Sequence, residues 1–130
     1  MTQVRFDPRA TLLVFPCTIK YQDVRTTLLA LDTGASATII RESSLIAIGY
    51  SIDSITESVS FGDASQSHLA PKVVLKSLSL ADARVDNIEA LCYTIPEEYG
   101  IDGVIGLNFL RHFNIGLDFE HGILTLNRVR

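Results

Sequence analysis

The chain has 130 residues, a length typical of one domain, and 47% of them are hydrophobic, which is enough for a sizeable core. Its net charge of −4 and its scattered lysines and arginines argue against a nucleic-acid-binding protein, because such proteins usually carry a basic face. No apolar stretch reaches the roughly 18–20 residues of a membrane span, and residues 1–10 lack the apolar centre of a signal peptide. We therefore expect a soluble, cytoplasmic protein that binds neither nucleic acid nor membrane.

Short segments in which apolar and polar residues alternate recur along the chain and predict strands. In the first, one face carries Leu13, Phe15, Cys17, Ile19 and Tyr21. The segments with this pattern are 13–21, 28–32, 58–61, 88–92, 115–119 and 123–126. They favour an all-β barrel or sandwich, and no linker divides the chain. Cys17 and Cys92 lie in such segments, and we expect both to be small buried side chains. The sequence alone does not exclude a disulfide between them.

Two segments have a helical pattern. "RESSLIAIG" predicts one short turn that ends at Gly49. "GLNFLRHFN" predicts a helix of about two turns, because Leu107, Leu110 and Phe113 recur at helical spacing and Phe109 pairs with Phe113. The sequence thus predicts one short helix near the C-terminus of a β-rich domain.

Most catalytic patterns are missing from the sequence. There is no Gly-x-Ser-x-Gly elbow, no glycine-rich phosphate loop and no His or Cys pair with zinc-ligand spacing. The histidines at positions 68, 112 and 121 lie in unrelated segments and read as surface residues. We therefore expect neither a metal nor a cofactor, and acidic residues are left as the candidates for catalysis.

Three aspartates follow apolar residues. Asp102 precedes a glycine, a pair that indicates a turn, and Asp118 alternates with Leu117 and Phe119 as an outward strand position would. Asp32 differs because a Thr-Gly-Ala-Ser stretch follows it and a second apolar run comes directly after. A glycine permits a sharp turn and the hydroxyls can hydrogen-bond within it, so Asp32 is the strongest candidate for a functional carboxylate.

Four segments in order resemble the retropepsin-like aspartic proteases, the single-domain relatives of pepsin. "LLALDTGASATII" is similar to their catalytic loop, and "SVSFGDASQSHLAPKVVL" resembles their β-hairpin flap. "DGVIGLNFLRHF" is similar to the second signature, two apolar residues and a glycine before a short helix, and "IGLDFEHGILTL" resembles the closing hairpin. The resemblance implies the closed acid-protease β-barrel and aspartic endopeptidase activity.

The resemblance implies a role for each position of the catalytic loop. Asp32 would be the catalytic aspartate, and Thr33 would join the two loops of the active site through its hydroxyl. Gly34 would let the loop turn and let substrate approach the backbone, while Ala35 and Ser36 would complete the loop.

The second signature is matched by Val104, Ile105 and Gly106, which would form the strand that crosses beside the catalytic loop. Asn108 falls in the first turn of the following helix, where the family often has Asn or Asp. Leu107 stands where retroviral members commonly carry Arg, and Ser36 stands where they carry Asp. The chain is therefore more similar to cellular and bacterial members than to retroviral ones.

The flap segment would hold an extended peptide against the catalytic loop, as an added strand does. The candidates for flap contacts are Ser60, Phe61, Gly62 and Asp63. The alternative for this segment is an exposed hairpin with a turn-forming Gly-Asp pair.

An aspartic protease needs two carboxylates that share a proton, and only one Asp-Thr-Gly exists here. The resemblance therefore implies a homodimer in which each chain contributes Asp32, acting on peptides or unfolded proteins. We expect an N-terminal arm over residues 1–10 and a single protease domain over residues 11–130.

Two other interpretations of the sequence are open at this stage. The same fold could serve as a catalytically silent dimeric module for peptide binding or dimerisation, because a fold does not fix a function. The Asp-Thr-Gly could also be an incidental strand-end turn in an unrelated β-barrel. That reading would have to explain why the flap-like hairpin and the second signature occur in the right order.

Overall fold

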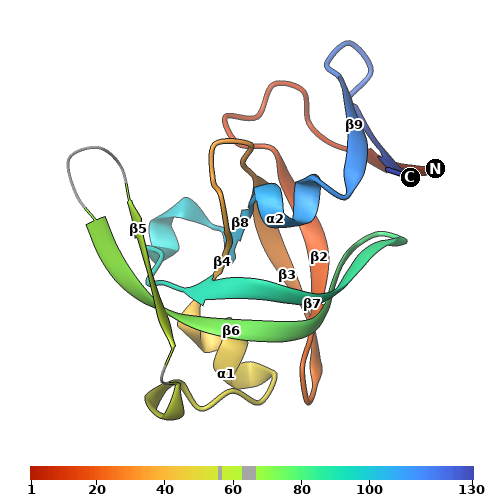
Figure 1. Ribbon diagram of the computed structural model, residues 1–130. Helices are drawn as coiled ribbons and strands as arrows, with labels where there is room; N and C mark the ends of the chain where they lie inside the picture. Colours follow the sequence, from red (N-terminus) through yellow and green to blue (C-terminus); the bar gives the residue numbers. More distant parts are fainter. Residues whose placement is uncertain (56, 63–66) are drawn as a thin grey trace.

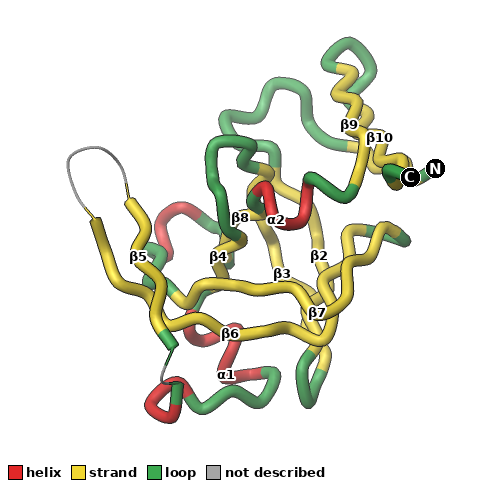
Figure 2. The backbone as a smooth tube through the Cα atoms, in the orientation of Figure 1, coloured by secondary structure: helices red, strands yellow, loops and turns green. Residues whose placement is uncertain are grey.

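The computed structural model describes residues 1–55, 57–62 and 67–130, and it is mostly β (Figure 1). The strands are β1 (Thr2–Arg5), β2 (Val14–Lys20), β3 (Val24–Leu31), β4 (Thr38–Ile40), β5 (Ser58–Gly62), β6 (Ser67–Leu80), β7 (Ala83–Cys92), β8 (Gly103–Ile105), β9 (Phe113–Asp118) and β10 (Ile123–Arg128). The helices are α1 (Glu42–Ala47), α2 (Leu107–Leu110) and the 3-10 turns η1 (Ile52–Ser54) and η2 (Glu97–Tyr99). Figure 2 shows how little of the described chain is helical.

Six strands of the described chain close a barrel in the order β2-β3-β8-β4-β7-β6, and β6 pairs back with β2. The alternation predicted for the first strand is confirmed, because Phe15, Cys17 and Ile19 are all buried. They join a core to which α1 and α2 also contribute, through Leu45 and Phe109. Both cysteines are free and buried, as small apolar side chains would be, and burial raises the pKa of the Cys17 thiol to about 12.

Strand β8 lies between β3 and β4 although it comes more than 60 residues later in the chain. It runs parallel to β3, with Leu29 opposite Gly103, and antiparallel to β4, with Ile40 opposite the same glycine. A Cβ atom at Gly103 would lie 2.0 Å from the carbonyl oxygen of Ile39, so only glycine permits this close approach. The crossing brings the ends of β3 and β8 together, where the predicted catalytic loop begins.

The hairpin of β5 and β6 projects from the barrel (Figure 1). Its strands match the segment that resembles a flap, with Ser58 opposite Pro71 and Gly62 opposite Ser67. The β6 strand is 14 residues long, so its second half continues into the barrel beside β7. Residues 63–66, which include Asp63, lie outside the described part of the chain.

A separate sheet in the order β1-β10-β9 contains both ends of the chain. Residues 2–5, within the stretch expected to be an arm, form β1 and pair with β10. The sequence prediction for α2 was too long: the helix ends at Leu110 after one turn, and Phe113 already belongs to β9, where it pairs with Arg128 of β10. Phe113 still contacts Phe109, at 5.2 Å between ring centroids, so the predicted apolar contact forms without a second helical turn.

None of the helices in the described part of the chain combines the length and the apolar character that crossing a membrane would require.

Candidate active site

Asp32 follows the last residue of β3, at the point where the chain leaves the barrel wall. Its backbone N–H donates to the carbonyl oxygen of Ile105 in β8 at 3.0 Å, and its carbonyl oxygen accepts the N–H of Ala35 at 3.2 Å. Its carboxylate oxygen Oδ1 accepts the N–H of Gly34 at 2.9 Å. These bonds turn the chain sharply and fix one carboxylate oxygen, while the residue stays exposed to solvent.

The far side of this loop rests on the start of α2. The carbonyl oxygen of Ala35 accepts the N–H of Leu107 at 2.7 Å, and the N–H of Gly106 donates to the hydroxyl of Thr38 at 3.2 Å. A Cβ atom at Gly106 would lie 2.4 Å from the carbonyl group of Ala37, which explains the glycine of the second signature. The Asp-Thr-Gly loop and the second signature are therefore one packed unit.

Asn108 links this unit to β7, the strand next to β4 in the barrel. Its Oδ1 atom accepts hydrogen bonds from the amide and the hydroxyl of Thr38, at 2.9 and 2.8 Å. Its Nδ2 atom donates to the carbonyl oxygen of Glu89 in β7 at 2.7 Å. Thr38 is fully buried and was not singled out from the sequence. Its hydroxyl stands within the apolar run that follows the loop, and this could have identified Thr38 from the sequence. A hydroxyl in a buried strand needs a hydrogen-bond partner.

A cleft of about 220 Å³ opens beside the carboxylate. Its lining residues are Asp32, Gly34, Ala35, Ser36, Ala37, Ile39 and Leu91. Asp32 is the single acidic residue among these described lining residues, and the other side chains are small or apolar. Thr33 and Ser36 are exposed at the same edge. The cleft therefore carries one carboxylate among small and apolar side chains.

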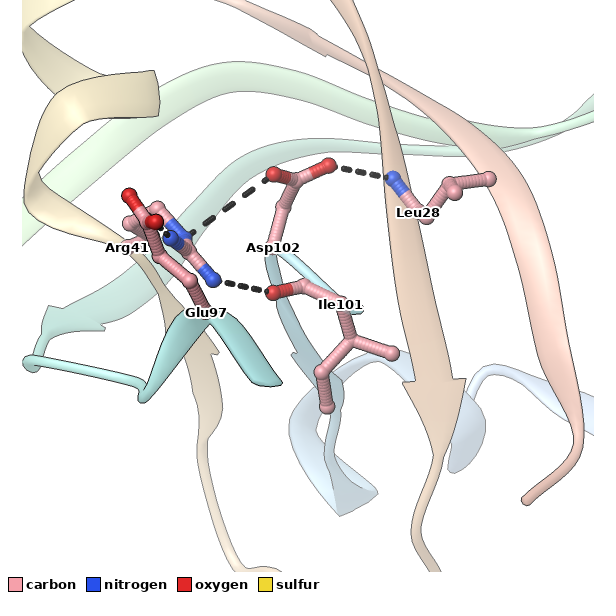
Figure 3. Close-up of polar contacts among 5 residues, drawn as sticks. All are labelled: Leu28, Arg41, Glu97, Ile101 and Asp102. Atoms are coloured by element: carbon pink, nitrogen blue, oxygen red, sulfur yellow. Dashed lines mark hydrogen bonds and ion pairs between the residues drawn. The ribbon is translucent and has the colours of Figure 1, made fainter. Parts of the chain in front are cut away.

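The opposite end of the β3-β8-β4 unit is fixed by Asp102, as Figure 3 shows. Its Oδ2 atom accepts the N–H of Leu28 at 2.8 Å, and its own N–H donates to the carbonyl oxygen of Leu28 at 2.7 Å. Its carbonyl oxygen accepts the N–H of Arg41 at 2.7 Å. The turn expected from Asp-Gly is thus a cross-link among three strands, a role that the sequence prediction missed.

The Arg41 side chain lies beneath this cross-link. Its Nη2 atom donates to the carbonyl oxygen of Ile101 at 2.7 Å, and its Nε atom lies 4.0 Å from Oδ1 of Asp102 (Figure 3). Nε is buried and has no hydrogen-bond partner in the described chain. Glu97, whose side chain is almost fully exposed, approaches the guanidinium at 4.0 Å. The contacts of the Arg41 guanidinium therefore hold the loop before β8 against the end of β4.

The other predicted site residues divide into those near the loop and those on the hairpin. Val104 and Ile105 lie in β8, and the carbonyl oxygen of Ile105 accepts the N–H of Asp32. Ser60, Phe61 and Gly62 lie in β5, and Asp63 lies outside the described residues. Among the described residues, no three His, Cys, Asp or Glu side chains gather as a metal site would require.

Comparison with known proteins assigns the family. The model of the aspartyl protease family matches residues 15–109, from β2 to α2. The chain belongs to the aspartyl protease family. Because the match contains both the Asp-Thr-Gly loop and the second signature, an incidental turn in an unrelated barrel is excluded.

Comparison with solved structures shows the fold of this family member. A retropepsin-like aspartic protease from Rickettsia conorii superimposes with a TM-score of 0.75 at 16% identity, over 98% of this chain and 91% of that chain. The retroviral protease-like domain of Ddi1 from Leishmania major gives a TM-score of 0.56 at 17% identity, over 93% and 92%. No curated protein sequence matches the chain. At these identities the similarity establishes the retropepsin-like fold, which confirms the all-β barrel expected from the sequence.

Proposed function

We propose that this protein is an aspartic endopeptidase that hydrolyses peptide bonds as a homodimer. The observation that carries the proposal is the cleft with a single carboxylate. The family's chemistry needs a base that activates water and an acid that hydrogen-bonds the scissile carbonyl. Asp32 can supply one of these groups, and the same residue of a second chain supplies the other when a two-fold axis passes beside the loop.

The exposure of the loop supports this arrangement. Asp32, Thr33, Gly34 and Ser36 are all exposed in the single chain, although they form a loop that is fixed from below by buried hydrogen bonds. A rigid, exposed loop with polar side chains is suited to contact with a second copy. Two carboxylates brought to about 3 Å share one proton, because both cannot stay ionised at that distance.

The substrate of the proposed enzyme is an extended peptide segment or an unfolded protein. The cleft is lined by polar groups of the loop and by the apolar side chains of Ile39 and Leu91. The β5 strand is the edge of its sheet, and an edge strand offers backbone groups that can pair with an extended peptide. Ser60, Phe61, Gly62 and Asp63 remain the proposed contacts from this hairpin.

The proposed mechanism uses the chain's own groups. The ionised carboxylate of one Asp32 accepts a proton from water, and the water oxygen attacks the scissile carbonyl carbon. The protonated carboxylate of the other Asp32 donates a hydrogen bond to the carbonyl oxygen and stabilises the charge that develops there. The carboxyl group that took the proton from water then gives it to the amide nitrogen, and the C–N bond breaks to release an amine and a carboxylic acid. The N–H of Gly34, which donates to Asp32 Oδ1, keeps that carboxylate oriented during the reaction.

The test compares Asp32→Asn with Asp53→Asn, which makes the same chemical change at an exposed position outside the cleft. Cleavage of unfolded casein at acidic pH should disappear in Asp32→Asn and persist in Asp53→Asn. Sedimentation should give the same dimer for both variants and for the native chain. Full activity in Asp32→Asn, or activity in a strictly monomeric protein, refutes the shared carboxylate pair.

A catalytically silent dimeric module with the same fold is the second candidate. The exposed loop favours it as much as it favours the enzyme, because exposure supports contact with a second copy in both cases. A peptide that contains statine, whose hydroxyl imitates the tetrahedral intermediate, separates the two. Binding of this peptide together with casein cleavage supports the enzyme, whereas peptide binding without cleavage by the native chain supports the silent module.

A further inference from the structure

Lys72 occupies the point where the β5–β6 hairpin leaves the barrel. Before it, Pro71 pairs with Ser58 of β5, and from Lys72 onward β6 pairs with β7, beginning with Leu91. The N–H of Lys72 also donates to the carbonyl oxygen of Glu57 at 2.9 Å. At this residue β6 therefore has a neighbour on each side, and the hairpin and the barrel meet there.

The Lys72 ammonium binds a carboxylate from each neighbour. Its Nζ atom lies 3.0 Å from Oε2 of Glu57 and 3.2 Å from Oε1 of Glu89. Glu89 is opposite Val74, so it is diagonal to Lys72 on the ladder and within reach of a long side chain. The Lys72 side chain is only 23% exposed, whereas the two carboxylates are largely exposed. Hydrogen bonds to the two carboxylates raise the pKa of Lys72.

The network continues from Glu89 to the catalytic loop. The carbonyl oxygen of Glu89 accepts Nδ2 of Asn108 at 2.7 Å, and Asn108 accepts both hydrogen bonds of Thr38. The Thr38 hydroxyl in turn accepts the N–H of Gly106. Lys72 contacts the Glu89 carboxylate and Asn108 contacts the Glu89 backbone carbonyl, so Glu89 itself connects the base of the hairpin to Thr38 and Gly106, which flank the loop that carries Asp32. Each contact restricts the orientation of the next, because every group among them has a specific partner.

We propose that Lys72 is a positioning residue that couples the β5–β6 hairpin to the catalytic loop through Glu89 and Asn108. The catalytic part of this inference rests on the proposed function, because the hairpin matters for cleavage only when substrate binds beneath it. Exposed ion pairs contribute little to stability when they are isolated. Lys72 joins β6 to Glu57, which directly precedes β5, and to Glu89 in β7, so it should act on hairpin placement more than on folding.

The first experiment measures amide hydrogen exchange by NMR, residue by residue, and needs no enzymatic activity. Lys72→Met should raise the exchange rates of the residue-72, Thr38 and Gly106 amides about three- to fivefold, the loss expected for one ion-pair network. Lys72→Arg should restore them. Lys76→Met removes the same charge from the same strand without touching either glutamate, and it should leave all three rates unchanged.

The exchange data decide the coupling in either direction. Unchanged rates at Thr38 and Gly106 in Lys72→Met overturn it, and so does an equal increase in Lys76→Met. Peptide cleavage then tests the positioning role: Lys72→Met should raise KM about threefold with kcat retained, and Lys72→Arg should reverse the change. An unchanged KM overturns that role. If the native chain cleaves no peptide, the proposed function fails, while the exchange data still decide the coupling.

Discussion

The Oδ1 atom of Asn108 accepts two hydrogen bonds from Thr38, one from the backbone amide at 2.9 Å and one from the hydroxyl at 2.8 Å. Asn108 belongs to α2 and Thr38 begins β4, so the pair joins the two motifs that define the site. Because Thr38 is fully buried, no water can replace Asn108 as its partner without a local rearrangement.

Asn108→Ala should therefore lower the free energy of unfolding by about 1–3 kcal/mol, the cost of a buried donor without a partner. Urea denaturation at one fixed protein concentration measures this, because the stability of a dimer depends on concentration. Asn127→Ala, at an exposed position of β10, should change stability by less than about 0.5 kcal/mol. Equal losses in the two variants would show that the Thr38 contact has no special importance.

Gly106→Ala should destabilise the fold by about 3 kcal/mol or more, because the new Cβ would meet the Ala37 carbonyl group at 2.4 Å. Gly100→Ala is the matched control. Gly100 has φ of +67° but open space around its Cβ position, so only backbone strain of about 1 kcal/mol is expected. Thermal and urea unfolding should show a larger loss of stability for Gly106→Ala than for Gly100→Ala. A smaller loss for Gly106→Ala would contradict the close approach of Gly106 to Ala37.

Asp102→Ala should cost about 1–2 kcal/mol, because the Leu28 N–H loses a charged acceptor and the Arg41 guanidinium loses its neighbouring carboxylate. Asp102→Asn keeps an acceptor for Leu28 and should recover more than half of that loss. Urea unfolding of both variants distinguishes the hydrogen bond from the charge. If Asn is as damaging as Ala, the charge beside Arg41 carries the effect.

The pH dependence of stability should include a contribution from the β9–β10 turn. The N–H and imidazole of His121 hydrogen-bond Asp118 and lower the pKa of that carboxyl. A lowered folded-state pKa stabilises the fold above the ordinary aspartate pKa, and this stabilisation is lost as the pH falls through the lowered value. The difference in unfolding free energy between the native chain and Asp118→Asn should therefore shrink toward acidic pH. A difference that grew on acidification would contradict this assignment.

The sequence predicted the features that depend on neighbouring residues. The alternation of Phe15, Cys17 and Ile19 identified a strand with one buried face, and Gly49 marked the end of α1, where it adopts φ of +113°. The order of the Asp-Thr-Gly loop and the second signature identified the fold. Each of these patterns involves residues that are close together in the sequence, so each can be recognised without knowing the tertiary contacts.

Contacts between distant residues were not predictable in the same way. The Asp-Gly pair at residue 102 has the composition of a turn, yet Asp102 bonds Leu28, which lies 74 residues earlier. The helical spacing of Phe113 suggested a second turn of α2, but pairing with β10 placed this residue in a strand. Nothing near Thr38 in the sequence indicates Asn108 as its partner. In each case a tertiary contact decided among conformations that the local sequence permits.

The position of β8 between β3 and β4 has a consequence for when the Asp32 loop can form during synthesis. The loop that carries Asp32 is supported by Ile105 and Leu107, so it lacks its supporting partners until a segment some 70 residues later has been made. Contacts of such long sequence separation form late, because closing a large loop costs entropy before the contact stabilises it. During synthesis the emerging chain should therefore carry its aspartate in an unformed, inactive loop. Any activity that depends on this loop is therefore expected only after the chain has been made as far as α2.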